Sequence, residues 1–98
     1  MATFILFLNW AEQGAKTLKD LTKRAQNARA LAEKLKANSQ AYVTMGQYDV
    51  VVTVELPDGE AVAKFAAAIS AAGNARTTTV RGFSLEEFAK LAAEAPSL

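Results

Sequence analysis

The sequence contains neither cysteine nor histidine among its 98 residues. Without cysteine the chain can form no disulfide, no thiolate nucleophile, no zinc finger and no iron–sulfur cluster. Without histidine it lacks the commonest general base and the commonest ligand of transition metals. Any acid–base chemistry would depend on Asp, Glu, Tyr or Lys, and we expect neither a metal ion nor another cofactor.

Long apolar runs are also missing. The only continuous apolar run near the start covers residues 4–8, which is too short for a signal-peptide core, and no basic region precedes it. No stretch approaches the length of a membrane span. We therefore expect a cytoplasmic protein without a membrane partner, and the length suits a single domain over residues 1–98.

Charge is nearly balanced, with a formal net charge of +1, but it is unevenly placed. Seven of the eleven Lys and Arg residues fall between residues 16 and 36, and the last fifteen residues are acidic. Asp20 and Arg24 stand four apart, which is the spacing of an ordinary ion pair on a helix. We interpret the basic segment as a solvated helix face, with phosphate binding as the alternative.

Alternating apolar residues predict four strands, and a glycine marks the hairpin between the middle two. Gly46 supplies the turn there, and Gly14 lies in an expected connection over residues 11–16. The predicted strands cover residues 3–9, 40–45, 49–56 and 75–83.

Helical spacing of apolar residues predicts three helices. Thr17 is a plausible N-cap for a long helix that ends near Asn38. Asp58 is expected to cap a second helix, which Gly73 closes. Residues 84–87 have the pattern of a capping box, which opens a short third helix that stops before Pro96.

The order β-α-β-β-α-β with a trailing helix predicts an α+β, ferredoxin-like fold. We expect one four-stranded antiparallel sheet of strand order 4-1-3-2, with both main helices on one face. The wholly apolar sets should pack under the helices: Phe4, Leu6, Leu8, Val50, Val52 and Val54.

Three further apolar residues, Ile5, Phe7 and Val51, should form a patch at the centre of the opposite face. Monomers rarely expose such a patch, so we expect a second copy of the chain to stack on it as a homodimer or higher oligomer. The alternative is that the trailing helix covers this face.

Polar residues on the same face would line a pocket between two stacked sheets. Arg81 is expected to be the only cation there, which favours a small anionic or carbonyl-bearing ligand, and Asp49 would orient it or act as a base. Trp10 is either a substrate contact or a packing lid. The side chains predicted to line this pocket are Asn9, Tyr42, Thr44, Asp49, Thr53, Glu55, Thr77, Thr79 and Arg81.

Two placements follow from the expected sheet. We expect the end of the fourth strand beside the starts of the first and third, which brings Arg81 and Asp49 to one end, roughly 10 Å apart. Whether this pair shares a ligand or forms an ion pair at the rim is open. A second group, Asn9, Glu55 and Thr77, should gather at the opposite end. Tyr48 is expected on the helix side.

The segment Gly-Gln-Tyr-Asp at residues 46–49 stands between an opening strand, FILFLNW, and the later stretch GNARTTTVRGF at residues 73–83. Together they resemble the GYD domain family over nearly the whole chain. The sequence differs at residues 36–38, where glycines are expected after the helix. The resemblance implies similarity to the dimeric α/β-barrel superfamily, in which two ferredoxin-like sheets pack face to face.

That superfamily includes ligand-sensing domains of leucine-responsive-type regulators, cofactor-independent monooxygenases and muconolactone-isomerase-like enzymes, but the resemblance implies no activity for the GYD family itself. Three hypotheses stay open. The chain is a homodimeric module that binds a small molecule without a cofactor, or a structural or protein-interaction module. Alternatively it is a cofactor-independent oxygenase or isomerase, in which case the candidate residues are Asn9, Trp10, Asp49 and Arg81.

Nucleic acid is not an expected partner. RNA-recognition modules share this topology, but they need aromatic residues on the open face of the third strand. Here that face presents two acids and no aromatic ring: Asp49, Val51, Thr53 and Glu55.

Overall fold

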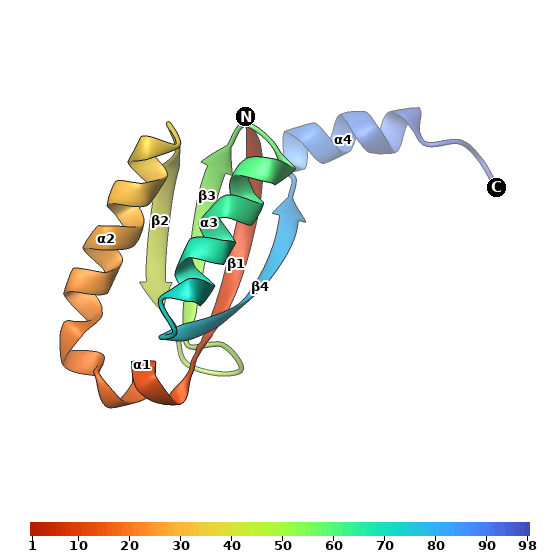
Figure 1. Ribbon diagram of the computed structural model, residues 1–98. Helices are drawn as coiled ribbons and strands as arrows, with labels where there is room; N and C mark the ends of the chain where they lie inside the picture. The colour runs from red at the N-terminus through yellow and green to blue at the C-terminus, as the bar shows by residue number, and fades with distance from the viewer.

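The computed structural model describes all 98 residues, and its centre is one four-stranded antiparallel sheet covered by helices on one side (Figure 1). In chain order the elements are β1 (Ala2–Trp10), α1 (Glu12–Lys16), the 3-10 helix η1 (Leu18–Asp20), α2 (Leu21–Lys34), β2 (Asn38–Val43), β3 (Val50–Leu56), α3 (Gly59–Ala71), β4 (Ala75–Gly82) and α4 (Leu85–Glu94).

The strand order is β2-β3-β1-β4, which confirms the predicted order 4-1-3-2 and the ferredoxin-like fold class. The central strand β1 is antiparallel to both of its neighbours, β3 and β4. Helices α2 and α3 lie side by side over the same face of the sheet (Figure 1). The other face, which we call the open face, has no helix over it.

The hydrophobic core lies between the sheet and the two long helices. The strand residues predicted to pack there are all buried, as are Phe65 and Val62 of α3. Leu6 and Phe65 are 0% and 1% exposed, so each contributes about 1.5–3 kcal/mol of apolar burial. Strict alternation of burial along β1 and β3 confirms which residues face the helices.

The segment before the long helix differs from prediction. The expected connection over residues 11–16 contains the short helix α1, and η1 follows it, so α2 begins at Leu21. Thr17 does not cap α2. Instead its hydroxyl donates to the Gln13 carbonyl oxygen at 2.8 Å, because a short polar side chain can bond back to the preceding turn.

The long helix ends at Lys34, four residues before the predicted end at Asn38. Lys36 takes the left-handed conformation, with φ of 58°. Its N–H donates to Glu33 and the Ala37 N–H donates to Ala32, which is the hydrogen-bond pattern of a Schellman motif. A lysine therefore occupies the position where the GYD resemblance led us to expect glycine. Strand β2 then begins at Asn38.

The caps of the two later helices agree with prediction. An Asp58 carboxylate oxygen accepts from the Ala61 N–H at 3.0 Å, and Ser84 forms both bonds of a capping box with Glu87. Helix α4 buries none of its residues and extends away from the sheet, with the C-terminus beyond it (Figure 1). The trailing helix therefore does not cover the open face. No helix combines the length and apolar character needed to cross a membrane.

Candidate functional site

The open face carries the predicted apolar patch and two residues more. Phe7 lies opposite Val51, and Ile5 lies opposite Val80 on the other neighbouring strand. Val80 is 40% exposed. The Tyr48 ring packs on the Phe7 ring, with 4.6 Å between ring centroids, so the prediction that Tyr48 faces the helices was wrong. The patch is wider than the sequence indicated.

The predicted faces of β4 were wrong. Thr77, Thr79 and Arg81 lie opposite Leu8, Leu6 and Phe4, which places all three on the helix side of the sheet rather than on the open face. The reason is the buried Ala75, which lies opposite Trp10 and fixes the odd-numbered residues of β4 toward the helices. The even-numbered residues, Arg76, Thr78 and Val80, therefore face the open side.

The two predicted groupings at the ends of the sheet were also wrong. β4 runs antiparallel to β1, so Arg81 lies beside Phe4 near the start of β1. β3 is antiparallel to β1 as well, so Asp49 lies near the end of β1, at the other end of the sheet. Glu55 is opposite Thr3 and thus far from Asn9. The starts of antiparallel neighbours cannot lie together.

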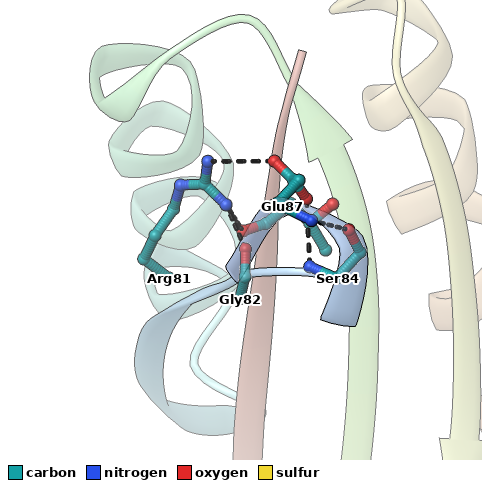
Figure 2. A network of polar contacts seen from close by, with 5 residues as sticks. Arg81, Gly82, Ser84 and Glu87 are labelled. Carbon is teal, nitrogen blue, oxygen red and sulfur yellow. Dashed lines mark hydrogen bonds and ion pairs between the residues drawn. The ribbon is translucent and has the colours of Figure 1, made fainter. Parts of the chain in front are cut away.

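Arg81 is held by local contacts at the start of α4. Its guanidinium lies over the Phe83 ring at 4.3 Å and over the Phe4 ring at 5.7 Å. It donates to the carbonyl oxygens of Thr3 and Gly82. Figure 2 shows these bonds, and it also shows the Glu87 carboxylate, whose Oε2 atom is 4.0 Å from the Nη2 atom of Arg81. These contacts connect β4 to α4, and Arg81 lies on the opposite side of the sheet from the patch.

The pKa of Glu87 is lowered from its ordinary value of 4.5. The largest cause is the Ser84 backbone N–H, which donates to the ionised carboxylate at 3.0 Å; the Ser84 side chain and the charge of Arg81 act in the same direction. The Glu87 side chain is 47% exposed, and its bonds with Ser84 order the N-terminus of α4.

The Gly-Gln-Tyr-Asp segment fastens the β2–β3 hairpin to the central strand. Gly46 has φ of 124°, which allows the chain to reverse there. Tyr48 packs on Phe7, as described above. Asp49 bonds twice to β1: its N–H donates to the Leu8 carbonyl, and its Oδ2 atom accepts from the Trp10 N–H at 2.9 Å. The Asp49 carboxylate is therefore engaged in a structural bond across 39 residues of sequence.

A half-open cavity of about 370 Å³ lies on the helix side, between the sheet and helices α2 and α3. Thirteen of its sixteen lining residues are hydrophobic, and they come from β1, β2, β3, β4 and both helices or their ends. The Trp10 side chain forms part of its wall. The three polar lining residues are Arg24, Asn27 and Asn74.

Arg24 is the unusual member of the cavity wall. Its Nη2 atom donates to the Gly14 carbonyl oxygen at 3.3 Å. Its Nε and Nη1 atoms are shielded from solvent, and neither has a hydrogen-bond partner. The two ion pairs of the chain join Lys16 to Glu12 and Arg81 to Glu87, so the expected pair between Asp20 and Arg24 does not form. Unpaired buried donors of this kind each cost about 1–3 kcal/mol.

The seven residues predicted to bind a ligand are thus divided among three places. Asn9 and Tyr42 lie on the open face, opposite Arg76 and Val51. Trp10 lines the cavity, and Asp49 bonds to its backbone. The remaining three, Thr77, Thr79 and Arg81, lie on β4 and face the helix side. Their binding role stays a prediction, and they do not form one pocket within the chain.

Sequence reasoning missed two cations. Arg76, rather than Arg81, is the cation on the open face. Arg24 was treated as part of a solvated face, although its spacing from Leu21 and Ala28 places it on the apolar stripe of α2. A charge within an apolar stripe was the available signal. No group of three or more acidic side chains stands close enough to hold a metal ion.

The geometry defines a ferredoxin-like α+β domain with an apolar cavity under its helices. The sequence profile of the GYD domain matches residues 4–92, so the chain belongs to the GYD domain family. A protein of Thermus thermophilus is similar in its crystal structure: the TM-score is 0.57, the identity is 22%, and the match covers 86% of this chain and 95% of that one. This likeness shows the fold alone. No protein of curated function matches the chain.

Proposed function

We propose that this GYD domain is a homodimeric module that binds a small apolar molecule without a cofactor. The observation that carries the proposal is the cavity between the sheet and its helices, with its mostly apolar wall. Small-molecule sites are concave, largely apolar and have volumes of about 300–1,000 Å³, with a few polar groups that orient the ligand. The volume and lining of this cavity fit that description.

The homodimer is supported by the open face. Ile5, Phe7 and Val51 lie together there, flanked by Val80 and by the Tyr48 ring, and no element of the chain covers them. A contiguous apolar patch on one side of a sheet is typical of a surface that packs on a partner. A second copy of the chain offers the same patch, so stacking the two sheets would bury both at once.

The enzyme hypothesis receives no comparable support. Its proposed residues do not meet, because Arg81 lies at the far end of the sheet and the Asp49 carboxylate accepts from Trp10. The structural and protein-interaction hypothesis stays open beside the proposal. The expected cytoplasmic location likewise remains a prediction.

The dimer is tested by sedimentation equilibrium at micromolar concentration. We expect the wild-type chain, of 10.4 kDa, to sediment at about twice that mass. Phe7→Glu would place a charge in the desolvated interface and should yield a monomer. Since Phe7 also supports Tyr48, Val80→Glu on the more exposed edge strand provides a second test. Met45→Glu, at a fully exposed loop position, is the control and should remain dimeric. A monomeric wild type would refute the dimer.

Ligand binding is tested by the fluorescence of Trp10, the only tryptophan in the chain and part of the cavity wall. We expect addition of 1-octanol to change its emission in a saturable manner, because an apolar chain would replace water beside the indole ring. Native mass spectrometry of freshly purified protein would then be used to find a resident ligand. If octanol and related apolar molecules cause no saturable change, the cavity is not a binding site.

A further inference from the structure

We infer that the ligand of the cavity carries a carboxylate or a similar anionic head group, and that Arg24 recognises it. The inference rests on the proposed function, since it names the chemical class of molecule that the cavity would hold. It depends on one observation beyond the cavity itself: an arginine in the wall with two donor atoms, Nε and Nη1, that are buried and have no partner.

The surroundings of Arg24 leave its charge uncompensated. The guanidinium makes one bond, from Nη2 to the Gly14 carbonyl oxygen, while Nε and Nη1 are shielded from solvent and donate to no atom of the chain. Both ion pairs of the chain involve other residues. Buried charges in proteins are normally paired, because desolvation without a partner is unfavourable. Nη1 lies beside Gly14, so an anionic ligand would become the missing partner when the guanidinium turns from Gly14 toward the cavity.

The other lining residues of the cavity indicate the chemical nature of the uncharged part of the ligand. Apart from Arg24 the polar lining residues are the two amides, Asn27 and Asn74, and the Asn74 Oδ1 atom already accepts from Gln13. An apolar cavity of about 150 Å³ is large enough for benzene, and the volume here, about 370 Å³, is roughly two and a half times as large. A medium-length alkyl or two-ring aromatic carboxylate combines this body with the anionic head. Sugars and nucleotides would leave most of their polar groups unpaired.

The experiment compares octanoate, 1-octanol and octylammonium, which share one chain and differ in the charge of the head. Binding is measured by Trp10 emission and by calorimetry. In the wild-type protein we expect octanoate to bind roughly tenfold or more tightly than octanol, and octylammonium to bind least. Arg24→Met keeps an apolar stem of similar length without the charge. It should lose the preference for octanoate over octanol.

Arg29→Met is the matched control, because Arg29 is an exposed arginine of the same helix and does not line the cavity. It should keep the full preference, which would exclude a general effect of the basic helix. Far-UV circular dichroism verifies that each variant folds, and the three-ligand comparison in wild type needs no variant.

The outcomes distinguish failure of the inference about Arg24 from failure of the proposed function. If octanoate and octanol bind wild type equally, or if Arg24→Met keeps the preference, Arg24 does not recognise an anion, while the cavity remains a binding site. If none of the three molecules binds, the proposed function fails, and this inference fails with it.

Discussion

Replacing Gly14 by alanine should destabilise the domain, although alanine is the better helix former. Gly14 is buried in α1, and a Cβ atom added there would lie 1.9 Å from the Asn74 carbonyl oxygen and 2.8 Å from its carbon. Contacts of this kind require at least 3.0 Å, so α1 and the Asn74 backbone would have to separate by roughly 1 Å. Neither partner is a flexible side chain, so the contact cannot relax cheaply.

The expected change in the free energy of unfolding of Gly14→Ala is the sum of three contributions. Forced overpacking costs about 1–3 kcal/mol. The Ala11 N–H donates to the same Asn74 oxygen at 3.0 Å, and losing this bond adds about 1 kcal/mol. Alanine recovers up to about 1 kcal/mol of helix propensity. We therefore expect a net loss of about 2 kcal/mol, which for a domain of this size lowers the melting temperature by about 8–16 °C.

The assay is thermal and urea unfolding followed by circular dichroism, with Gly59→Ala as the matched control. Gly59 is the first residue of α3, and nothing lies within 4 Å of the added Cβ atom. This variant should be as stable as wild type or more stable by up to about 1 kcal/mol. A Gly14→Ala protein as stable as wild type would refute the close approach of α1 to Asn74.

Two further predictions concern carboxylates. Asp49→Ala removes the acceptor of the Trp10 N–H and should lower the free energy of unfolding by about 1.5–3 kcal/mol, whereas Asp49→Asn keeps an acceptor and should lose less; equal urea midpoints for the two variants would contradict this. For Glu87, a pKa below the unfolded value means that its contribution is complete above about pH 4.5 and is lost as the pH falls through the lowered pKa. NMR chemical shifts of α4 should therefore report unwinding of its first turn in acid in wild type, and a smaller change in Glu87→Gln; identical pH profiles would exclude the capping role.

The fold was predictable because its signals were strong and repeated. β1 and β3 alternate apolar residues under the helices with mixed residues on the open face, so their register admits only one arrangement. Asp58 and Ser84 precede their helices with the side chains that caps require. The strand order then follows from the sequence of elements.

The face of β4 could not be predicted from the same kind of signal. Between Ala75 and Gly82 the only apolar residue is Val80, and it was assigned to the core, although it faces the open side. β4 is an edge strand, exposed along most of its length, so hydrophobicity there does not report which side faces the helices. Arg81 added to the error, because its long side chain lies on aromatic rings on the helix side.

The candidate site was missed for a different reason. Arg24 was assigned to a pair with Asp20 by spacing alone, but α2 begins only at Leu21, so Asp20 lies outside that helix. The side chain of Arg24 then reaches Gly14, ten residues earlier in the chain. Such a contact depends on how α1 packs beside Asn74, and no local pattern encodes it.

The Gly-Gln-Tyr-Asp hairpin segment has a consequence for how members of the family are recognised. Its glycine, tyrosine and aspartate act on the chain's own loop and on β1. Position 24 lies on a separate helix and takes no part in those contacts. A chain can therefore retain the signature and exchange the side chain at position 24 without disturbing it. Members of the family should therefore be compared first at the residues under the helices, because the shared residues of the loop only fasten the hairpin to β1.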